Sequence, residues 1–195
     1  MAAPLCTGLR KGELLGLHWD DLDLESGTAS IRRTLQRTRT QGLTTLPIKT
    51  ASSERRIALP TERIRSLQRH RQRQDAERAA AGETWPESGY VFTTSTGQPI
   101  DPSNLSRASS SLCRRAGLRR IRSHDLRHSA ATLLLEQGVE LVVIKELLGH
   151  AHIGVTAAVY AHVRTRLQRH AIDTLGDALR GPEDPGDPSL AAAAR

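Results

Sequence analysis

Glycines divide the second half of the chain into segments that have room only for short helices. Three segments with helical spacing of apolar residues are each followed by a glycine. They span residues 102–116, 124–137 and 140–148, and the glycines are Gly117, Gly138 and Gly149. A glycine in this place is the usual left-handed cap of a helix. Two more helices are predicted at 155–162 and 164–179, so this half is helical throughout.

The first half of the chain has a different pattern, in which strand-like segments lie between two helices. Strands are predicted at 28–35, 43–49 and 55–59, with a turn at Gly42, and a further short strand at Val91-Phe92. Helices are predicted at 9–18 and at 61–81, the second ending near Gly82. The fold class is therefore α+β, mainly α-helical with a small antiparallel β-sheet. The proline-rich tail 181–195 is predicted to be disordered.

The distribution of charge favours a polyanionic partner. The formal net charge is +7, and residues 31–78 hold thirteen basic side chains against four acidic ones. Such stretches attract nucleic acid by releasing condensed counterions, although a solvated basic face would have the same composition. An aromatic content of 3% argues against a single-strand binder that stacks bases. Double-stranded DNA, contacted through its phosphates, fits this composition better.

Other features of the sequence bear on the compartment. No apolar run approaches the ~20 residues that span a bilayer, and the start at Met1 lacks the regions of a signal peptide. Two cysteines, Cys6 and Cys113, do not make a disulfide framework. We expect a cytoplasmic, nucleoid-associated protein without a membrane partner.

The segment Ser123-His124-Asp125-Leu126-Arg127-His128 is the most informative for chemistry. With Ser123 as the predicted N-cap, His124, Arg127 and His128 share one face of the first helical turns. A helix start with an imidazole and a guanidinium suits an anion such as phosphate. The opposite face is predicted to be buried through its apolar residues, Leu126, Ala130, Leu133 and Leu134. The alternative is a capped helix with a solvated basic end.

Four blocks along the chain together resemble the tyrosine recombinase family of the phage-integrase class. They are Thr7-Gly8-Leu9-Arg10 running to Leu17, Pro47-Ile48-Lys49-Thr50 with Ser53 to Pro60, the His124 segment, and Leu147-Leu148-Gly149-His150 running to Tyr160 and His162. Each block is weak alone, but their order and spacing make the set specific. The likeness covers roughly residues 5–175.

The resemblance implies a role for each matching residue. Arg10 and Arg127 match the two arginines that clamp the scissile phosphate, and Lys49 matches the lysine that protonates the leaving 5′ oxygen. His124 and His150 match the two histidines, and Tyr160 matches the attacking tyrosine. Glu13 matches an acidic position that orients the site. General DNA contacts are assigned to four further arginines, Arg32, Arg33, Arg55 and Arg122.

The implied chemistry uses no metal and no cofactor. Two guanidiniums can neutralise a phosphodiester and its pentavalent transition state. Because a phenol with a pKa of roughly 10 is a poor nucleophile at neutral pH, Tyr160 needs a base, which His124 could supply. The 3′-phosphotyrosyl intermediate conserves the bond energy, so a 5′-OH can reseal the strand without ATP. A zinc site at His150 and His152 is the weaker alternative, because no third ligand has suitable spacing.

The resemblance also implies a domain organisation and an assembly. Residues 1–180 match the catalytic domain, without its first helices and without the DNA-binding domain that precedes it in relatives, so we expect a complete set of site residues on a weakened scaffold. The helix at 164–179, with Leu167, Ile172, Leu175 and Leu179, predicts a homotetramer on paired DNA sites. The predicted function is site-specific recombination that integrates or excises a mobile element. Two alternatives stay open: a DNA-binding remnant of an integrase, and nicking and sealing like that of a type IB topoisomerase.

Overall fold

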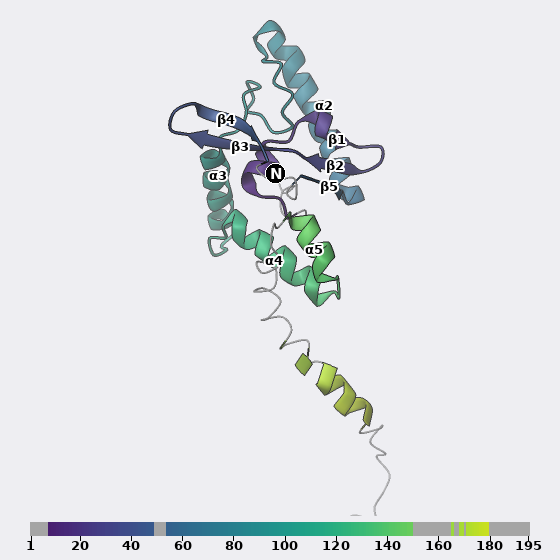
Figure 1. Ribbon diagram of the computed structural model, residues 1–195. Helices are drawn as coiled ribbons and strands as arrows, with labels where there is room; N and C mark the ends of the chain where they lie inside the picture. The colour runs from purple at the N-terminus through teal and green to yellow at the C-terminus, as the bar shows by residue number, and fades with distance from the viewer. Residues whose placement is uncertain (1–7, 49–53, 150–164, 166–167, 170, 180–195) are drawn as a thin grey trace, which may run out of the picture.

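The computed structural model describes residues 8–48, 54–149, 165, 168–169 and 171–179, and Figure 1 shows how its elements are arranged. In chain order the elements are α1 (Lys11–Leu15), the 3-10 helix η2 (Trp19–Asp21), β1 (Leu22–Asp23), β2 (Thr28–Ile31), β3 (Arg33–Thr38), β4 (Gly42–Pro47), β5 (Arg55–Ala58), α2 (Thr61–Ala81), the 3-10 helix η4 (Gly82–Thr84), α3 (Pro102–Arg115), α4 (Ser123–Glu136) and α5 (Leu141–Leu148). The predicted fold class is confirmed: the fold is α+β, and most of its regular structure is helical.

The strands form two small antiparallel sheets where the sequence predicted one. The first has the order β1-β2-β5, and the second pairs β3 with β4. The predicted single strand 28–35 is wrong, because the chain leaves the first sheet at Arg32. Before that residue Ile31 pairs with Arg55 of β5, and after it Leu35 pairs with Thr45 of β4. The two halves of the predicted strand thus belong to different sheets.

The predicted strand at Val91-Phe92 is also absent. Isolated bridges lie on either side of it, between His18 and Tyr90 and between Thr93 and Pro99. Val91 is nevertheless fully buried. Its N–H donates to the carbonyl of Leu17, so its backbone is satisfied without a ladder of strand pairs.

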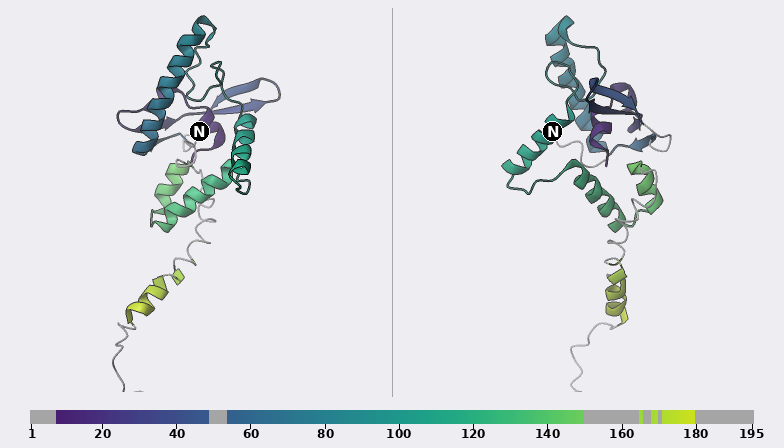
Figure 2. Two further views of the ribbon diagram at one scale, coloured as in Figure 1. Left: turned by 180° about the vertical axis from the view of Figure 1, so that it is seen from behind. Right: turned by 60° about the vertical axis from the view of Figure 1, so that its left-hand side comes forward.

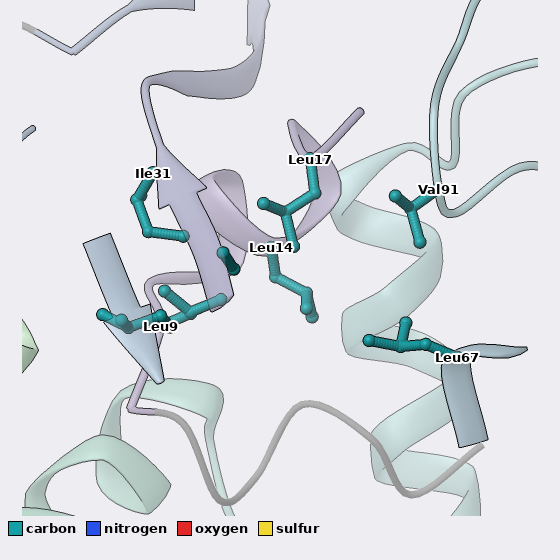
Figure 3. Packing of buried hydrophobic residues seen from close by; sticks show 8 residues of the cluster. Leu9, Leu14, Leu17, Ile31, Leu67 and Val91 are labelled. Atoms are coloured by element: carbon teal, nitrogen blue, oxygen red, sulfur yellow. The ribbon is translucent and has the colours of Figure 1, made fainter. Parts of the chain in front are cut away.

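The short helix α1 packs closely against β3. Gly12 and Gly16, four residues apart, face the strand: a β-carbon at Gly12 would lie 2.4 Å from Oγ1 of Thr34, and one at Gly16 would lie 3.0 Å from the backbone N of Leu35. The absence of a β-carbon therefore favours this close approach. Leu14 of α1 belongs to the main hydrophobic core, which Figure 3 shows from close by. Its labelled members are Leu9, Leu14, Leu17, Ile31, Leu67 and Val91.

Helices α4 and α5 pair with each other on the opposite side of the sheets from α2, as the views in Figures 1 and 2 show. A second core cluster lies between them and consists of Ala131, Leu135, Ile144 and Leu148. The predicted ends of α3, α4 and α5 are confirmed to within one residue. The glycines that follow these helices have the positive φ values expected of left-handed caps: 66° for Gly117, 78° for Gly138 and 62° for Gly149.

The buried face of α4 differs in part from the predicted one: Leu134 packs against the second core cluster, but the centre of the buried face lies elsewhere. The buried residues are Arg127, Ala131 and Leu135, at positions i, i+4 and i+8, whereas Leu133 is 58% exposed. The physical reason is that the guanidinium of Arg127 has backbone carbonyl partners inside the molecule, so that a charged residue lies on the core side of the helix.

Several predictions fall outside the described residues. They include the helix at 155–162, much of the helix at 164–179 and the tail at 181–195. Residues 171–179 are described and helical, and they lie apart from the other described elements in all three views (Figures 1 and 2). In the described part of the chain, no helix is both long enough and apolar enough to span a membrane.

Candidate functional site

A cleft of about 440 Å³ lies where α1, α3 and the start of α4 meet. Its lining is dominated by basic and hydroxyl side chains. The lining residues are Arg10, Lys11, Ser106, Ser109, Ser110, Arg120, Ile121, Arg122, Ser123, His124 and Arg127. Three of the residues predicted to act in catalysis thus face one cavity: Arg10 from near the start of the chain, and His124 and Arg127 from the start of α4. None of the described residues that line the cleft has a carboxylate, so this surface suits an anion.

Arg10 lies directly before α1, and Glu13 in the first turn of that helix holds it. The Glu13 carboxylate accepts the backbone N–H of Arg10 at 2.9 Å and its Nη1 at 2.6 Å. The Arg10 Nη2 donates to the carbonyl of Gly149 at 2.9 Å. The side chain remains 43% exposed. Because a guanidinium has five N–H donors, Arg10 keeps donors for a ligand in the cleft.

Arg127 reaches the cleft from a more buried position, in the second turn of α4. It is 3% exposed, and its two Nη atoms donate to the carbonyls of Gly8 and Leu148. Burial, and then the nearby positive charge of Arg10, lower the pKa of Arg127 to about 10. A guanidinium with this pKa is still protonated at neutral pH, so Arg127 presents a fixed positive charge.

Glu13 is also bonded to a second arginine, Arg55 at the start of β5. The Arg55 Nη2 donates to Oε2 at 2.9 Å and its Nη1 to Oε1 at 3.4 Å, and the two side chains are 8% and 3% exposed. Burial alone would raise the pKa of Glu13, but the hydrogen bonds and the charge of Arg55, with the bonds from Arg10, lower it below 4.5. The carboxylate is therefore ionised between two guanidiniums.

The carboxyl end of α5 is the point where these arginines converge. Three successive carbonyls there each accept a bond from a different arginine: Leu147 from Arg55 at 2.8 Å, Leu148 from Arg127, and Gly149 from Arg10. The last carbonyls of a helix have no partner within the helix, and the negative end of its dipole lies there. The guanidiniums satisfy these carbonyls and tie α1, β5 and α4 to α5.

His124 lies in the first turn of α4, next to His128. The two rings meet edge to face, with centroids 4.4 Å apart. Desolvation, and then the charges of His128 and Arg127, lower the pKa of His124 below 6.5. The imidazole is therefore neutral at pH 7 and able to accept a proton. The predicted N-cap Ser123 is wrong by one residue: the N-cap is Arg122, whose backbone N–H donates to the Asp125 carboxylate at 3.0 Å.

The four arginines predicted to make general DNA contacts occupy different environments. Arg122 is exposed and paired with Asp125, and Arg32 is half exposed, 3.8 Å from Glu54. Arg33 is 32% exposed and paired with Asp21. Arg55 is buried, so it is not a surface cation like the other three.

Three predicted site residues, Lys49, His150 and Tyr160, lie outside the described residues. The structure in turn adds residues that the sequence analysis did not single out. Lys11 donates to the hydroxyl of Ser106 at 3.0 Å, and Ser109, Ser110 and Arg120 also line the cleft. The spacing of Ser106, Ser109 and Ser110, which puts them on one face of a helix, was a signal that could have identified this wall.

Comparisons with known proteins agree with the fold and with the sequence blocks. The model of the phage integrase family matches residues 3–166. The tyrosine recombinase XerC-like protein of Caldanaerobacter subterraneus subsp. tengcongensis is 39% identical over 183 residues, which cover 88% of this chain and 46% of that protein. The ICEBs1 integrase of Bacillus subtilis is 32% identical, and the match covers 89% of this chain and 46% of the integrase. The chain thus spans about half the length of these curated relatives.

Among solved structures, a similar one is the Tn1549 transposon integrase in complex with transposon right end DNA. It superposes with a TM-score of 0.70 at 25% identity, covering 86% of this chain and 56% of that one. The XerA recombinase superposes with a TM-score of 0.64 at 23% identity, which supports the likeness in fold.

Proposed function

Because this chain belongs to the phage integrase family, we propose that residues 1–180 form the catalytic domain of a tyrosine recombinase, which breaks and rejoins duplex DNA at specific sites. One observation carries the proposal: Arg10, His124 and Arg127 line one cationic cleft. The Tn1549 integrase is described in complex with transposon right end DNA, and the XerH site-specific recombinase, also similar to this chain, is described bound to its palindromic difH substrate. We therefore propose double-stranded DNA as the substrate.

In the proposed reaction, the phenol of Tyr160 attacks the scissile phosphorus. The phenolic proton passes to the neutral imidazole of His124, while Arg10 and Arg127 neutralise the charge that builds up on the non-bridging oxygens. The bond from phosphorus to the 5′ oxygen breaks, and Lys49 supplies the proton to that oxygen. The product is a 3′-phosphotyrosyl bond, which a 5′-OH attacks to reseal the strand. His150 is proposed to bind the same phosphate.

The test is covalent capture from a pool of nicked duplexes with a randomised core. A nick near the cleaved bond lets the short leaving strand diffuse away, so the adduct accumulates. We expect a denaturant-resistant adduct with the chain, and the trapped DNA then reports the preferred sequence. Tyr160→Phe should abolish the adduct, and an adduct that survives this substitution would refute the assigned nucleophile.

The same test separates the two alternative functions. A DNA-binding remnant would retain the pool in a filter assay but form no adduct. A nicking and sealing enzyme would form the adduct and relax supercoiled plasmid, but it would give no exchange between two plasmids that carry the captured sequence. Site-specific recombination requires both the adduct and the exchange.

Assembly into a homotetramer on paired sites is proposed for the same reaction. The helical residues 171–179 present Ile172, Leu175 and Leu179, which are 69%, 59% and 78% exposed. Large apolar side chains that are this exposed to solvent, close together on one helix, are typical of a surface that a partner covers. Sedimentation that finds only monomers bound to DNA with two captured sites would count against the tetramer.

A further inference from the structure

The proposed reaction assigns no step to Arg55. This arginine is nevertheless bonded to the carboxylate of Glu13, as Arg10 is. We propose that Arg55 is a positioning residue, which balances the charge of Glu13 and so leaves the charge of Arg10 available for the phosphate. The inference rests on the proposed function and deepens it. It concerns residues that all lie in the described part of the chain.

The first support is the geometry around Glu13. Its carboxylate lies between two guanidiniums, with Arg10 Nη1 at 2.6 Å from Oε1 and Arg55 Nη2 at 2.9 Å from Oε2. The carboxylate is 3% exposed, so water does not screen it. Without Arg55, the full negative charge of Glu13 would face Arg10 alone and would oppose the binding of a second anion to it.

The second support is the net charge of the cluster. Arg10 and Arg55 are bonded to Glu13, and the charge of Glu13 also acts on nearby Arg127, so these four described residues together carry two net positive charges. Attack of a phenolate on a phosphodiester monoanion passes through a transition state with two negative charges, which this cluster neutralises. Loss of Arg55 would leave one net positive charge, which is too little for the transition state but sufficient for the ground state.

The third support is that Arg55 is held in a fixed place. Its Nε donates to the carbonyl of Leu147 at 2.8 Å, and its side chain is 8% exposed. The absence of a β-carbon at Gly149 leaves room for it, because a β-carbon there would lie 2.5 Å from Nη1. A preorganised charge needs no rearrangement as the reaction proceeds, which is what electrostatic catalysis requires.

The experiment compares two substrates within one preparation of the full chain. Both are the nicked duplex recovered by covalent capture, one with the natural scissile phosphodiester and one with a methylphosphonate, which lacks one negative charge. The ratio of the two cleavage rates reports the positive charge of the site, and the fraction of folded enzyme cancels from it. We expect Arg55→Gln to lower the ratio of phosphodiester to methylphosphonate cleavage by about tenfold or more.

The double variant Arg55→Gln/Glu13→Gln is measured with the same two substrates. It removes the carboxylate together with its counter-ion, so Arg10 and Arg127 again provide two positive charges. We expect the ratio of phosphodiester to methylphosphonate cleavage in the double variant to return to within about threefold of that of the unsubstituted chain. The double variant should also cleave the phosphodiester at least about tenfold faster than Arg55→Gln. If Arg55→Gln does not fold, the double variant is compared with Glu13→Gln, whose ratio should be about tenfold higher because it keeps all three positive charges, and equal ratios in these two variants would overturn the inference. Arg78→Gln, which removes an arginine of α2 that is paired with Glu87, is the matched control and should leave the ratio unchanged.

The inference is overturned if Arg55→Gln cleaves more slowly but keeps the ratio, or if the double variant does not recover it, since Arg55 would then act only in folding. These outcomes differ from a failure of the proposed function. In that case the unsubstituted chain itself would capture no DNA.

Discussion

Replacing Gly149 by alanine should destabilise the protein more than the same change at other helix caps. Gly149 has φ +62°, and a left-handed backbone costs a residue with a β-carbon ~1–2 kcal/mol. The added β-carbon would also lie 2.5 Å from Nη1 and 2.9 Å from Cζ of Arg55, which must move. Because Arg55 bonds to Glu13 and Leu147, losing one of these charge-assisted bonds adds about 1.5–3 kcal/mol.

The matched controls are Gly117→Ala and Gly138→Ala. These glycines have φ +66° and +78°, and a β-carbon at either would meet nothing within 4 Å, so only the backbone cost applies. For a domain of this size, 1 kcal/mol shifts the midpoint of thermal unfolding by about 2–4 °C. We therefore expect Gly149→Ala to melt about 3–12 °C below the two controls when unfolding is followed by far-ultraviolet circular dichroism. A Gly149→Ala midpoint equal to that of Gly138→Ala would refute the packing of Arg55 against this glycine.

Three further predictions concern residues of the site and the N-cap of α3, a helix that lines the cleft. The pKa of Glu13 is below its ordinary value of 4.5 in the folded protein, so its carboxylate stabilises the fold above pH 4.5 and loses that effect as the pH falls through the lowered pKa; urea titrations should show a steeper loss of stability below pH 4.5 for the natural chain than for Glu13→Gln. Asp101 caps α3 by accepting the Ser103 N–H at 2.7 Å and is also bonded to Arg37, so Asp101→Ala should lower the free energy of unfolding by ~1 kcal/mol, whereas Asp75→Ala, an exposed change inside α2, should not. If His124 is the base, cleavage should rise with pH through a midpoint below 6.5, because the pKa of this imidazole is lowered; a His124→Asn variant that keeps this limb of the pH profile would exclude the role.

The helical half of the fold could be predicted because its signals are local. A glycine that caps a helix acts within one turn, and the positive φ of Gly117, Gly138 and Gly149 follows from the absence of a β-carbon. The break at Arg32 could not be predicted in this way. Ile31 and Leu35 are both buried, so the side chains alone suggest one continuous strand. The separation into two sheets depends on partners in β4 and β5, which only the folded chain brings together.

The candidate site also has a part that the sequence could predict and a part that it could not. The sequence blocks identified Arg10, His124 and Arg127, which the structure brings to one cleft. Arg55 was assigned to general DNA contact, because an arginine in a basic stretch usually lies at the surface. Its burial is decided by Glu13 and by the Leu147 carbonyl, which are 42 and 92 residues away in the sequence. No pattern among neighbouring residues in the sequence indicates partners that are so distant.

Arg10 and Arg127, the two arginines proposed to hold the scissile phosphate, differ in how much each contributes to the stability of the fold. Arg127 is buried, and its bonds to the carbonyls of Gly8 and Leu148 join the segment before α1 to the end of α5. Removing it would break both of these buried bonds, so a loss of DNA cleavage in an Arg127 variant would not separate binding from folding. Arg10 is 43% exposed and lies beside a carboxylate that Arg55 also holds. Arg10 also bonds to the carbonyl of Gly149, but because its side chain is the more exposed of the two, its substitution should perturb the cleft more than the core.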